Sequence, residues 1–306
     1  MTEYLPEGFL FGTAENDGCL NSFASLSECK QNGRIVEAPC IICDSHHNLV
    51  IDLGCMRGVI PREEGAVGIT EGTTKDIALI SRVNKPVCFV VKDFTHDENG
   101  EVCAVLSRRE AQLKCNKEYI STLTPGDVIP ARVTHLEQFG CFVDIGCGIP
   151  SLIPIDLISV SRISHPSDRF CVGQDIKAVV KGFDGGRVCL SHKELLGTWE
   201  QNAAMFEQGE TVTGIVRSVE DYGVFVELAP NLAGLAEPRG DIRVNQHASV
   251  YIKALIPEKM KIKLIIVSAF DNAFRSGKLN YFISEGHIDS WVYSCPNASK
   301  LIQTIF

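Results

Sequence analysis

Short segments in which apolar and polar residues alternate recur along most of the chain. Three of them share one pattern: Asn48–Cys55, Gly140–Cys147 and Gly223–Pro230. In the second, every other residue from Cys141 to Ile145 is apolar, and the first and third repeat this arrangement. A period of two is typical of a β-strand with one buried face. The sequence therefore predicts an equivalent strand in each of three repeated units.

The rest of each unit alternates in the same way and predicts further strands. They are Val128–Val133 and Thr211–Val216 before the shared segment, Asp175–Phe183 and Ser249–Ile256 after it, and Val102–Glu110, Arg187–Glu194 and Lys261–Val267 at the end of the unit. Units of roughly 60–85 residues with about five short strands are typical of small barrels. The predicted fold class is all-β, with three tandem five-stranded barrels and short helices as connectors.

Segments between and beyond the strands complete this organisation. Asn21–Gly33 predicts a helix that Asn21 or Ser22 caps, with Gly33 after its end, and Trp199–Gln208 predicts a helical spacer. Weak alternation in Tyr281–Ser294 predicts a hairpin packed on the last barrel. The predicted boundaries are 1–38 for an acidic N-terminal segment, 39–120 for a first, degenerate barrel, 121–198 for a second, 199–268 for a shortened third and 269–306 for a C-terminal tail.

Charge and cysteine content limit the binding partners and the cellular location that the sequence allows. The net charge is −9, and the first 38 residues hold six acidic and only two basic side chains. A protein that coats nucleic acid should be basic, but the near-neutral remainder leaves room for local basic surfaces. Thirteen scattered cysteines indicate reduced thiols in a cytosol rather than a disulfide framework. No apolar run is long enough for a membrane span, and the N-terminus lacks a secretory signal, so the expected location is cytoplasmic with no membrane partner.

Two pairs of aromatic residues recur at the same place in units two and three. Phe142 and Phe225 alternate with the apolar face of their strands, and Phe139 and Tyr222 stand three residues earlier, each followed by glycine. Residues three apart point to opposite faces of a regular strand, but a glycine bulge can bring both rings to one side. Such a pair would stack unpaired bases, worth about 1–3 kcal/mol per base. The alternative is that the rings cover a contact between domains.

The same alternation turns polar residues outward. It places Asp144 and Glu227 on the face opposite the core, together with several basic residues: Arg132, Lys177, Lys181, Arg217, Lys253, Lys259, Lys261 and Lys263. The last three alternate and would share one face as a phosphate track. They could equally form a charged edge that prevents strand pairing between molecules.

Units two and three resemble the S1-type RNA-binding domain, an OB-fold barrel. The resemblance rests on Pro125–Gly146 and Val172–Glu194 in unit two and on Gln208–Leu228 in unit three. The join between the units also resembles the short ribosomal protein S1-like proteins of low-GC Gram-positive bacteria. This resemblance implies OB-fold barrels that bind single-stranded RNA, with messenger RNA and the small ribosomal subunit as expected partners in translation.

The family's binding residues carry over in part. Its aromatic pair matches Phe139 with Phe142 and Tyr222 with Phe225, which the resemblance therefore implies as RNA-binding residues. Its acidic and basic pair before the last strand matches Asp184 and Arg187, and the corresponding segment of unit three holds Glu258 and Lys261. The family's histidine after the third strand is replaced by Pro154 and Glu237. Unit one has His47 and Val50 at the ring positions, so a scaffold or protein-docking role is expected for it.

Enzymatic and metal-binding interpretations find little support. Cys40 and Cys43 precede His46 and His47, but no second ligand pair follows, and two cysteines three apart on a strand point to opposite faces. No phosphate-binding loop, nucleophile elbow or HExxH motif occurs. The sequence thus predicts non-enzymatic binding of single-stranded RNA, with no cofactor, no metal and no catalytic residues. The alternatives are a protein-interaction or regulatory scaffold, or an accessory subunit in RNA decay.

Overall fold

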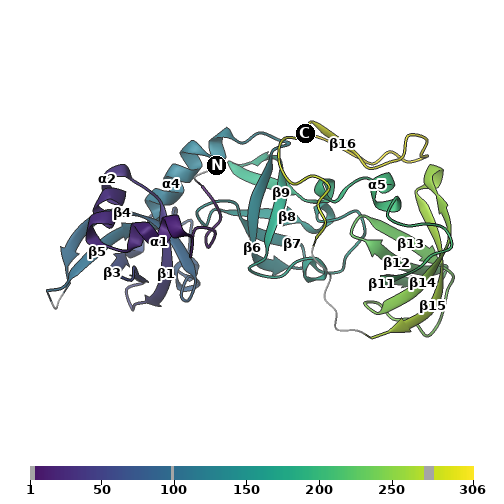
Figure 1. Ribbon diagram of the computed structural model, residues 1–306, viewed down its shortest axis with the longest axis horizontal. Coiled ribbons are helices and arrows are strands. Elements are labelled where there is room, and N and C mark those ends of the chain that lie inside the picture. The colour runs from purple at the N-terminus through teal and green to yellow at the C-terminus, as the bar shows by residue number, and fades with distance from the viewer. Residues whose placement is uncertain (1–3, 98–99, 272–278) are drawn as a thin grey trace. The chain divides into compact units, whose positions relative to one another are not determined.

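Three closed five-stranded barrels follow one another along the chain (Figure 1), which confirms the predicted fold class. The computed structural model describes residues 4–97, 100–271 and 279–306. The chain divides into two compact units. Unit one comprises Met1–Leu123 with Asp144–Pro150, and unit two comprises Thr124–Val143 with Ser151–Phe306.

Barrel one has the strand order β1-β2-β3-β5-β4, in which β3 and β5 run parallel and the other pairs are antiparallel. Its strands are β1 (Val36–Cys43), β2 (Leu49–Asp52), β3 (Arg57–Ile60), β4 (Pro86–His96) and β5 (Val102–Ser107). Leu49, Ile51 and Phe89 are fully buried in its core. The buried residues of β2 are those that the alternation selected.

Barrels two and three repeat this ring order. Barrel two consists of β6 (Val128–Glu137), β7 (Gly140–Asp144), β8 (Pro150–Pro154), β9 (Asp175–Asp184) and β10 (Arg187–Ser191). Barrel three consists of β11 (Thr211–Glu220), β12 (Gly223–Ala229), β13 (Leu232–Ala236), β14 (His247–Ile256) and β15 (Lys261–Phe270). The connection between the third and fourth strands shortens from residues 61–85 in barrel one to residues 237–246 in barrel three. The barrels therefore differ most in length at this connection.

Short helices accompany the barrels. They are α1 (Ala14–Leu20), α2 (Phe23–Asn32), α3 (Ile77–Ile80), α4 (Arg108–Glu118) and α5 (Trp199–Ala203), with 3₁₀ turns η1 (Arg62–Glu64), η2 (Ile120–Thr122), η3 (Ile155–Leu157), η4 (Pro166–Asp168), η5 (Lys193–Leu196) and η6 (Pro257–Lys259). Helix α2 has the predicted caps: the Ser22 side chain accepts the Ser25 N–H, and Gly33 adopts the left-handed conformation. Helix α5 is shorter than predicted.

The predicted strand Val102–Glu110 is wrong in its last three residues. The strand ends at Ser107, whose hydroxyl accepts the Glu110 N–H and caps α4. A serine followed by Arg-Arg-Glu-Ala favours a helix start, and this local signal outweighs the alternation. Helices α2 and α4 both pack against β4.

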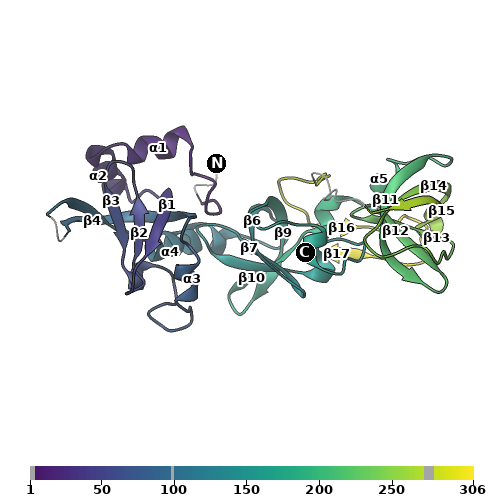
Figure 2. The ribbon, with the colours of Figure 1, turned by 90° about the horizontal axis from the view of Figure 1, so that it is seen from below.

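A two-stranded sheet lies at the C-terminus (Figure 2), formed by β16 (Ser290–Val292) and β17 (Gln303–Ile305). The predicted hairpin segment contains only β16, because its partner strand lies further along the chain. Trp291 and Tyr293 are buried in the same apolar cluster as Val224 and Val226 of barrel three. The tail also contacts barrel two, where the Gly286 carbonyl accepts the Val128 N–H. Residues 272–278 of the predicted tail lie outside the described residues.

Candidate nucleic-acid interface

The two aromatic residues of barrel two lie side by side. Phe139 occupies the turn between β6 and β7, and Phe142 lies on β7. Their ring centroids are 5.9 Å apart with the planes at 89°, an edge-to-face arrangement. Phe139 is 56% exposed and Phe142 is half-buried. We call these two residues the barrel-two ring pair.

Barrel three repeats the arrangement with Tyr222 and Phe225, which we call the barrel-three ring pair. The centroids are 6.1 Å apart with the planes at 85°. Tyr222 is 68% exposed. The pairing register of β11 shifts between Val216 and Ser218, opposite Phe225. The predicted juxtaposition of the rings is therefore confirmed, although the bulge that accompanies it lies on the partner strand rather than at the glycine.

The glycine inside each ring pair serves close strand packing. A Cβ atom at Gly140 would lie 2.6 Å from the Ile153 carbonyl oxygen, and one at Gly223 would lie 2.6 Å from that of Ala236. Real side chains do not approach backbone this closely, so only glycine lets the third strand of each barrel come so near. Each ring pair therefore lies where the second strand packs closely against the third.

A third ring, His135, belongs to the barrel-two site, and the sequence analysis missed it. Its centroid lies 6.4 Å from that of Phe142 with the planes at 35°, and its Nε2 atom is 2.6 Å from Glu137 Oε1. Strict alternation from buried Val133 assigns His135 to the core, but its side chain is 63% exposed. No signal in the sequence marks this change of face.

The remaining predicted site residues lie at the hairpins between the last two strands. Asp184 and Arg187 face each other across the β9–β10 turn, and both are exposed. Lys261 opens β15, pairs with Ile256 and is also exposed. Contacts of these three residues with RNA remain predictions.

Two acidic residues predicted to face outward are buried instead. Asp144 is 3% exposed and Glu227 is 5% exposed, because other segments cover the outer faces of their strands. Arg217, a basic residue predicted to face outward, is buried as well: its Nε atom lies 2.9 Å from Glu227 Oε2, and its side chain is 8% exposed. Arg132 forms hydrogen bonds with both carboxylate oxygens of Asp175.

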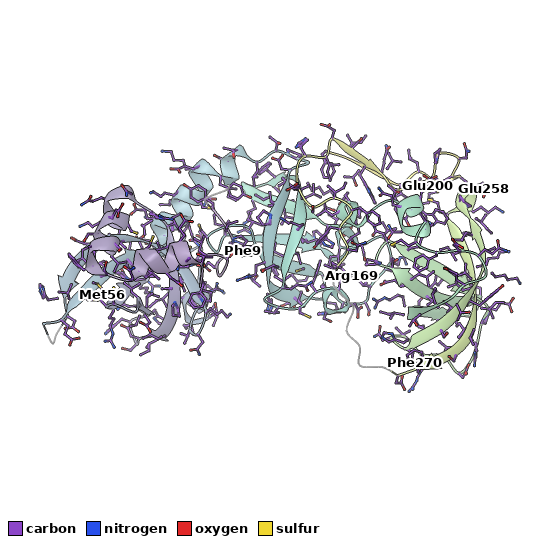
Figure 3. The ribbon with its side chains drawn as sticks, in the orientation of Figure 1. Phe9, Met56, Arg169, Glu200, Glu258 and Phe270 are labelled. Carbon is purple, nitrogen blue, oxygen red and sulfur yellow. The ribbon has the colours of Figure 1, made fainter. Side chains whose placement is uncertain are left out.

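Glu227 lies at the centre of a buried ionic cluster in unit two. Arg169, marked in Figure 3, donates to both of its oxygens at 2.7 and 2.9 Å. Arg169 directly follows η4, a 3₁₀ turn between β8 and β9 of barrel two. Burial alone would raise the pKa of Glu227, but Arg169 and Arg217 outweigh it and lower that pKa. Glu227 is therefore ionised and joins barrel two to barrel three.

Asp144 has different surroundings in unit one. Its oxygens accept N–H bonds from Glu7, Gly146 and Gly148. These bonds favour the charged form, but burial and the nearby Glu7 carboxylate raise the pKa of Asp144 to about 7. The Glu7 carboxylate stays ionised, because Arg108 and Arg82 hold its pKa at about 2 against the effect of burial.

Barrel one has no phenylalanine, tyrosine or tryptophan side chain at the two ring-pair positions. His47 lies in the turn before β2, and Val50 is half-buried on that strand. Cys40 is buried whereas Cys43 is only half-buried, and both are free thiols. Over residues 4–97, 100–271 and 279–306, no group of three or more His, Cys, Asp or Glu side chains is placed to hold a metal ion.

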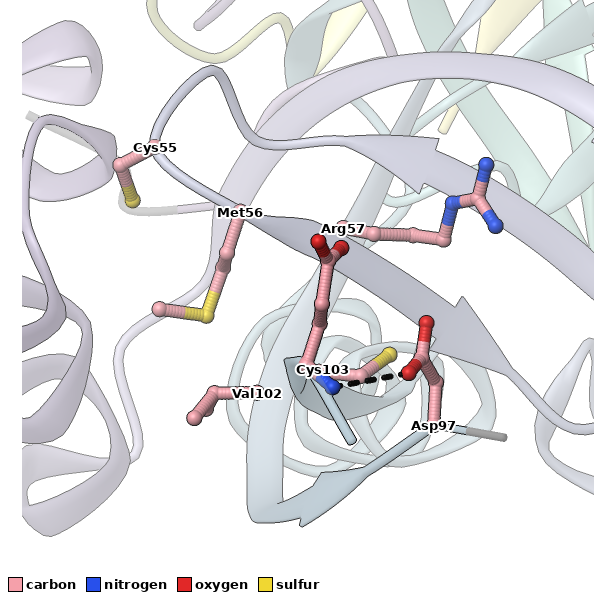
Figure 4. A pocket seen from close by; sticks show the side chains of 7 residues that line it. Cys55, Met56, Arg57, Asp97, Val102 and Cys103 are labelled. Atoms are coloured by element: carbon pink, nitrogen blue, oxygen red, sulfur yellow. Dashed lines mark hydrogen bonds between the residues drawn. The ribbon is translucent and has the colours of Figure 1, made fainter. Parts of the chain in front are cut away.

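A shallow pocket of barrel one is lined by residues of β3, β5 and the β4–β5 hairpin (Figure 4). Met56, Arg57 and Cys103 contribute to it, and Asp97 Oδ1 accepts the Glu101 N–H at 2.9 Å. None of the predicted site residues lines this pocket.

Comparison with known proteins is consistent with the repeated rings and the barrel topology. Residues 122–193 match the S1 RNA binding domain. This S1 domain coincides with barrel two and includes both rings of its pair as well as Asp184 and Arg187. The resemblance found in the sequence is thereby confirmed.

The chain is also similar to curated ribosomal proteins. It is 27% identical over 269 residues to small ribosomal subunit protein bS1 of Staphylococcus aureus strain COL, which covers 82% of this chain and 66% of the relative. It is 30% identical over 238 residues to the bS1 homolog of Bacillus cereus, covering 73% of this chain and 60% of the relative. The chain thus spans less than two thirds of the length of these relatives.

The chain is only weakly similar to a solved structure. A multidomain protein with nucleic acid binding domains from Streptococcus pneumoniae covers 76% of this chain and 73% of its own, at 14% identity and a TM-score of 0.25. That score supports no structural conclusion. Among the described residues, no helix is both long and apolar enough to cross a membrane.

Proposed function

We propose that this protein binds single-stranded RNA through barrels two and three and catalyses no reaction. The observation that carries the proposal is the repeated ring pair: one exposed and one half-buried aromatic residue, edge to face, at the same place in two barrels. Rings on a barrel surface stack unpaired bases of any sequence, and each stacked base contributes about 1–3 kcal/mol. Binding should therefore tolerate many sequences and prefer single strands.

The similarity to bS1 supports a setting in translation. The relatives from Staphylococcus and Bacillus are named as proteins of the small ribosomal subunit. We propose that this chain likewise holds messenger RNA near that subunit in the cytoplasm. Barrel one and the acidic segment before it would dock to protein, since barrel one lacks both rings.

A binding assay with matched ring variants tests the RNA interaction. Fluorescence anisotropy would compare a labelled unstructured RNA with a duplex of the same length, on the wild type and on the double variant Phe142→Ala/Phe225→Ala. We expect preference for the single strand and a loss of more than about 1 kcal/mol in the double variant. The barrel-one double variant His47→Ala/Val50→Ala changes the corresponding positions and should bind as the wild type does.

Two outcomes would contradict the proposal. Failure of the wild type to bind unstructured RNA even at low salt would favour a protein-interaction scaffold. Equal binding by the ring variant and the wild type would mean that the rings do not contact RNA. Circular dichroism of both double variants would establish that the barrels remain folded.

A further inference from the structure

The fourth strand of every barrel contains a bulge, and the extra residue is a lysine each time. The register shifts between Val91 and Asp93 in β4, between Val180 and Gly182 in β9, and between Ile252 and Ala254 in β14. The unpaired residues are Lys92, Lys181 and Lys253, which we call the bulge lysines. Bulges redirect a side chain and occur frequently beside functional sites. The alternation of the sequence turns Lys181 and Lys253 outward, but it does not show that they share one place in the repeat with Lys92.

The three bulge lysines differ in their partners. In barrel one, which has no ring pair, Lys92 forms an ion pair with Glu110 of α4 at 2.5 Å. Lys181 and Lys253 are exposed, and neither forms an ion pair with any residue in the described part of the chain. The bulge lysine thus has an acidic partner in barrel one, which lacks a ring pair. In the described part of barrels two and three, which have ring pairs, it has no such partner.

Barrel three places its lysine beside the ring pair through an unbroken row of paired residues. Phe225 of β12 pairs with Leu235 of β13, and Leu235 pairs with Lys263 of β15. Lys263 in turn pairs with Ala254, the residue directly after Lys253. Paired residues on neighbouring strands share a face of the sheet. Both lysines and Phe225 therefore lie on one continuous outer surface of the barrel.

Beyond Phe225, strand β12 leads to buried rather than exposed charged groups. Glu227, two residues after Phe225 on β12, is covered by Arg169 and Arg217, and all three side chains are at least nine-tenths buried. This cluster therefore presents no accessible charge to a ligand stacked on Phe225. The row through Leu235 leads instead to exposed positive charge, on the strands that end at the hairpin marked by Glu258 in Figure 3.

We propose that the bulge lysines of barrels two and three bind RNA phosphates next to the stacked bases. On barrel three, the sugar-phosphate backbone runs from the ring pair across β13 to Lys263 and Lys253. On barrel two, Lys181 takes the same role, because its neighbour Gly182 pairs with Cys189, which pairs with Leu152 of the third strand. This proposal rests on the proposed function, and it gives the bound strand a direction across the barrel.

The salt dependence of RNA binding tests the phosphate contacts separately from stacking. Each phosphate contact contributes about 0.7 to the slope of log affinity against log salt for single strands. The variant Lys253→Gln/Lys263→Gln should therefore give a slope shallower by about 1.4. If it binds about tenfold more weakly at about 50 mM salt, this slope leaves a loss of only about 1.5-fold at about 200 mM. Phe225→Ala should weaken binding with little change of slope.

Two further variants make the test specific. Lys92→Gln removes one positive charge at the corresponding bulge of barrel one and should leave affinity and slope unchanged. Lys253→Arg/Lys263→Arg keeps the charge and should restore the wild-type slope. Either equal weakening by Lys92→Gln or an unchanged slope in the double Gln variant would overturn the phosphate assignment, even if the ring variants still lose affinity. Failure of the wild type to bind RNA would instead overturn the proposed function and this inference together.

Discussion

Barrels two and three carry a carboxyl group at the same point of the repeat, and the structure gives the two groups opposite properties. Asp144 and Glu227 both lie on the second strand of their barrel, two residues after Phe142 and Phe225 respectively. Both are buried. The pKa of Asp144 is raised to about 7, whereas that of Glu227 is lowered.

One residue on the neighbouring strand accounts for much of this difference. Arg217 of β11 contacts Glu227, and Thr134 stands at the corresponding place in β6. Thr134 donates its hydroxyl hydrogen bond to the Phe142 carbonyl instead. Glu227 therefore has two guanidinium partners, whereas Asp144 lies beside the ionised Glu7 carboxylate. The difference shows that the position in the repeat determines burial, and the neighbouring charges determine ionisation.

Removing the charge of Glu227 should have the largest effect. In Glu227→Gln, the buried guanidinium groups of Arg169 and Arg217 lose their main counter-ion. Breaking a buried ion pair by removing one partner typically costs about 3–5 kcal/mol. We expect the free energy of unfolding of unit two to fall by this amount, measured by urea denaturation at neutral pH.

Two control variants sharpen this comparison. Glu220→Gln alters an exposed acid of β11 and should change stability by less than about 0.5 kcal/mol. Asp144→Asn at pH 6 should cost less than Glu227→Gln, because the Asp144 carboxyl is already largely protonated at that pH. Equal losses in the two repeat positions would show that their ionisation states do not differ.

The second prediction concerns the pH dependence of unit one. The folded-state pKa of Asp144, about 7, lies above its ordinary value of 3.8. A carboxyl with a raised pKa takes up a proton on folding, so its contribution is fully present below pH 3.8 and is lost as the pH rises through about 7. Glu37 should act in the same direction, since burial and Glu7 raise its pKa to about 7. Asp144→Asn and Glu37→Gln should each flatten the decline in stability between pH 5 and 8.

Thermal unfolding at several pH values would measure this effect, which we expect to be on the order of 2 kcal/mol. Glu227 should show the opposite pH dependence. Because its pKa is lowered, its contribution to the free energy of unfolding is lost as the pH falls below the ordinary glutamate pKa of 4.5, and Glu227→Gln should remove this loss. A wild-type stability that rises steadily from pH 5 to 8, with no change in Asp144→Asn, would contradict the assignment for Asp144.

The sequence predicted the architecture well because barrel strands are encoded locally. Alternation identified the cores of β2, β7 and β12, and the repetition of the pattern indicated three barrels. It failed where the outer face of a strand is covered by a distant segment. Asp144 and Glu227 were expected to be outward and accessible, and only the fold reveals Arg169 and Glu7 beside them.

The site was predictable to a similar extent. The ring pairs are visible in the sequence because both members and their glycine recur at fixed spacing. His135 is not, because its exposure breaks the alternation that starts from buried Val133. The alternation turned Lys181 and Lys253 outward, but it does not reveal that they and Lys92 occupy bulges. A pairing register is needed to recognise that Lys92, Lys181 and Lys253 are equivalent.

The smallest expected effect distinguishes the two ring pairs themselves. His135 lies beside Phe142, and barrel three has Ser218 at the corresponding position. If His135 adds a third stacking surface, His135→Ala should weaken binding of single-stranded RNA by up to about fivefold, or about 1 kcal/mol, whereas Ser218→Ala should leave it unchanged. Ser218→His should strengthen binding through barrel three by a similar factor. Anisotropy titrations of the three single variants measure these differences, and equal affinities throughout would show that the barrel-two ring pair binds without the histidine.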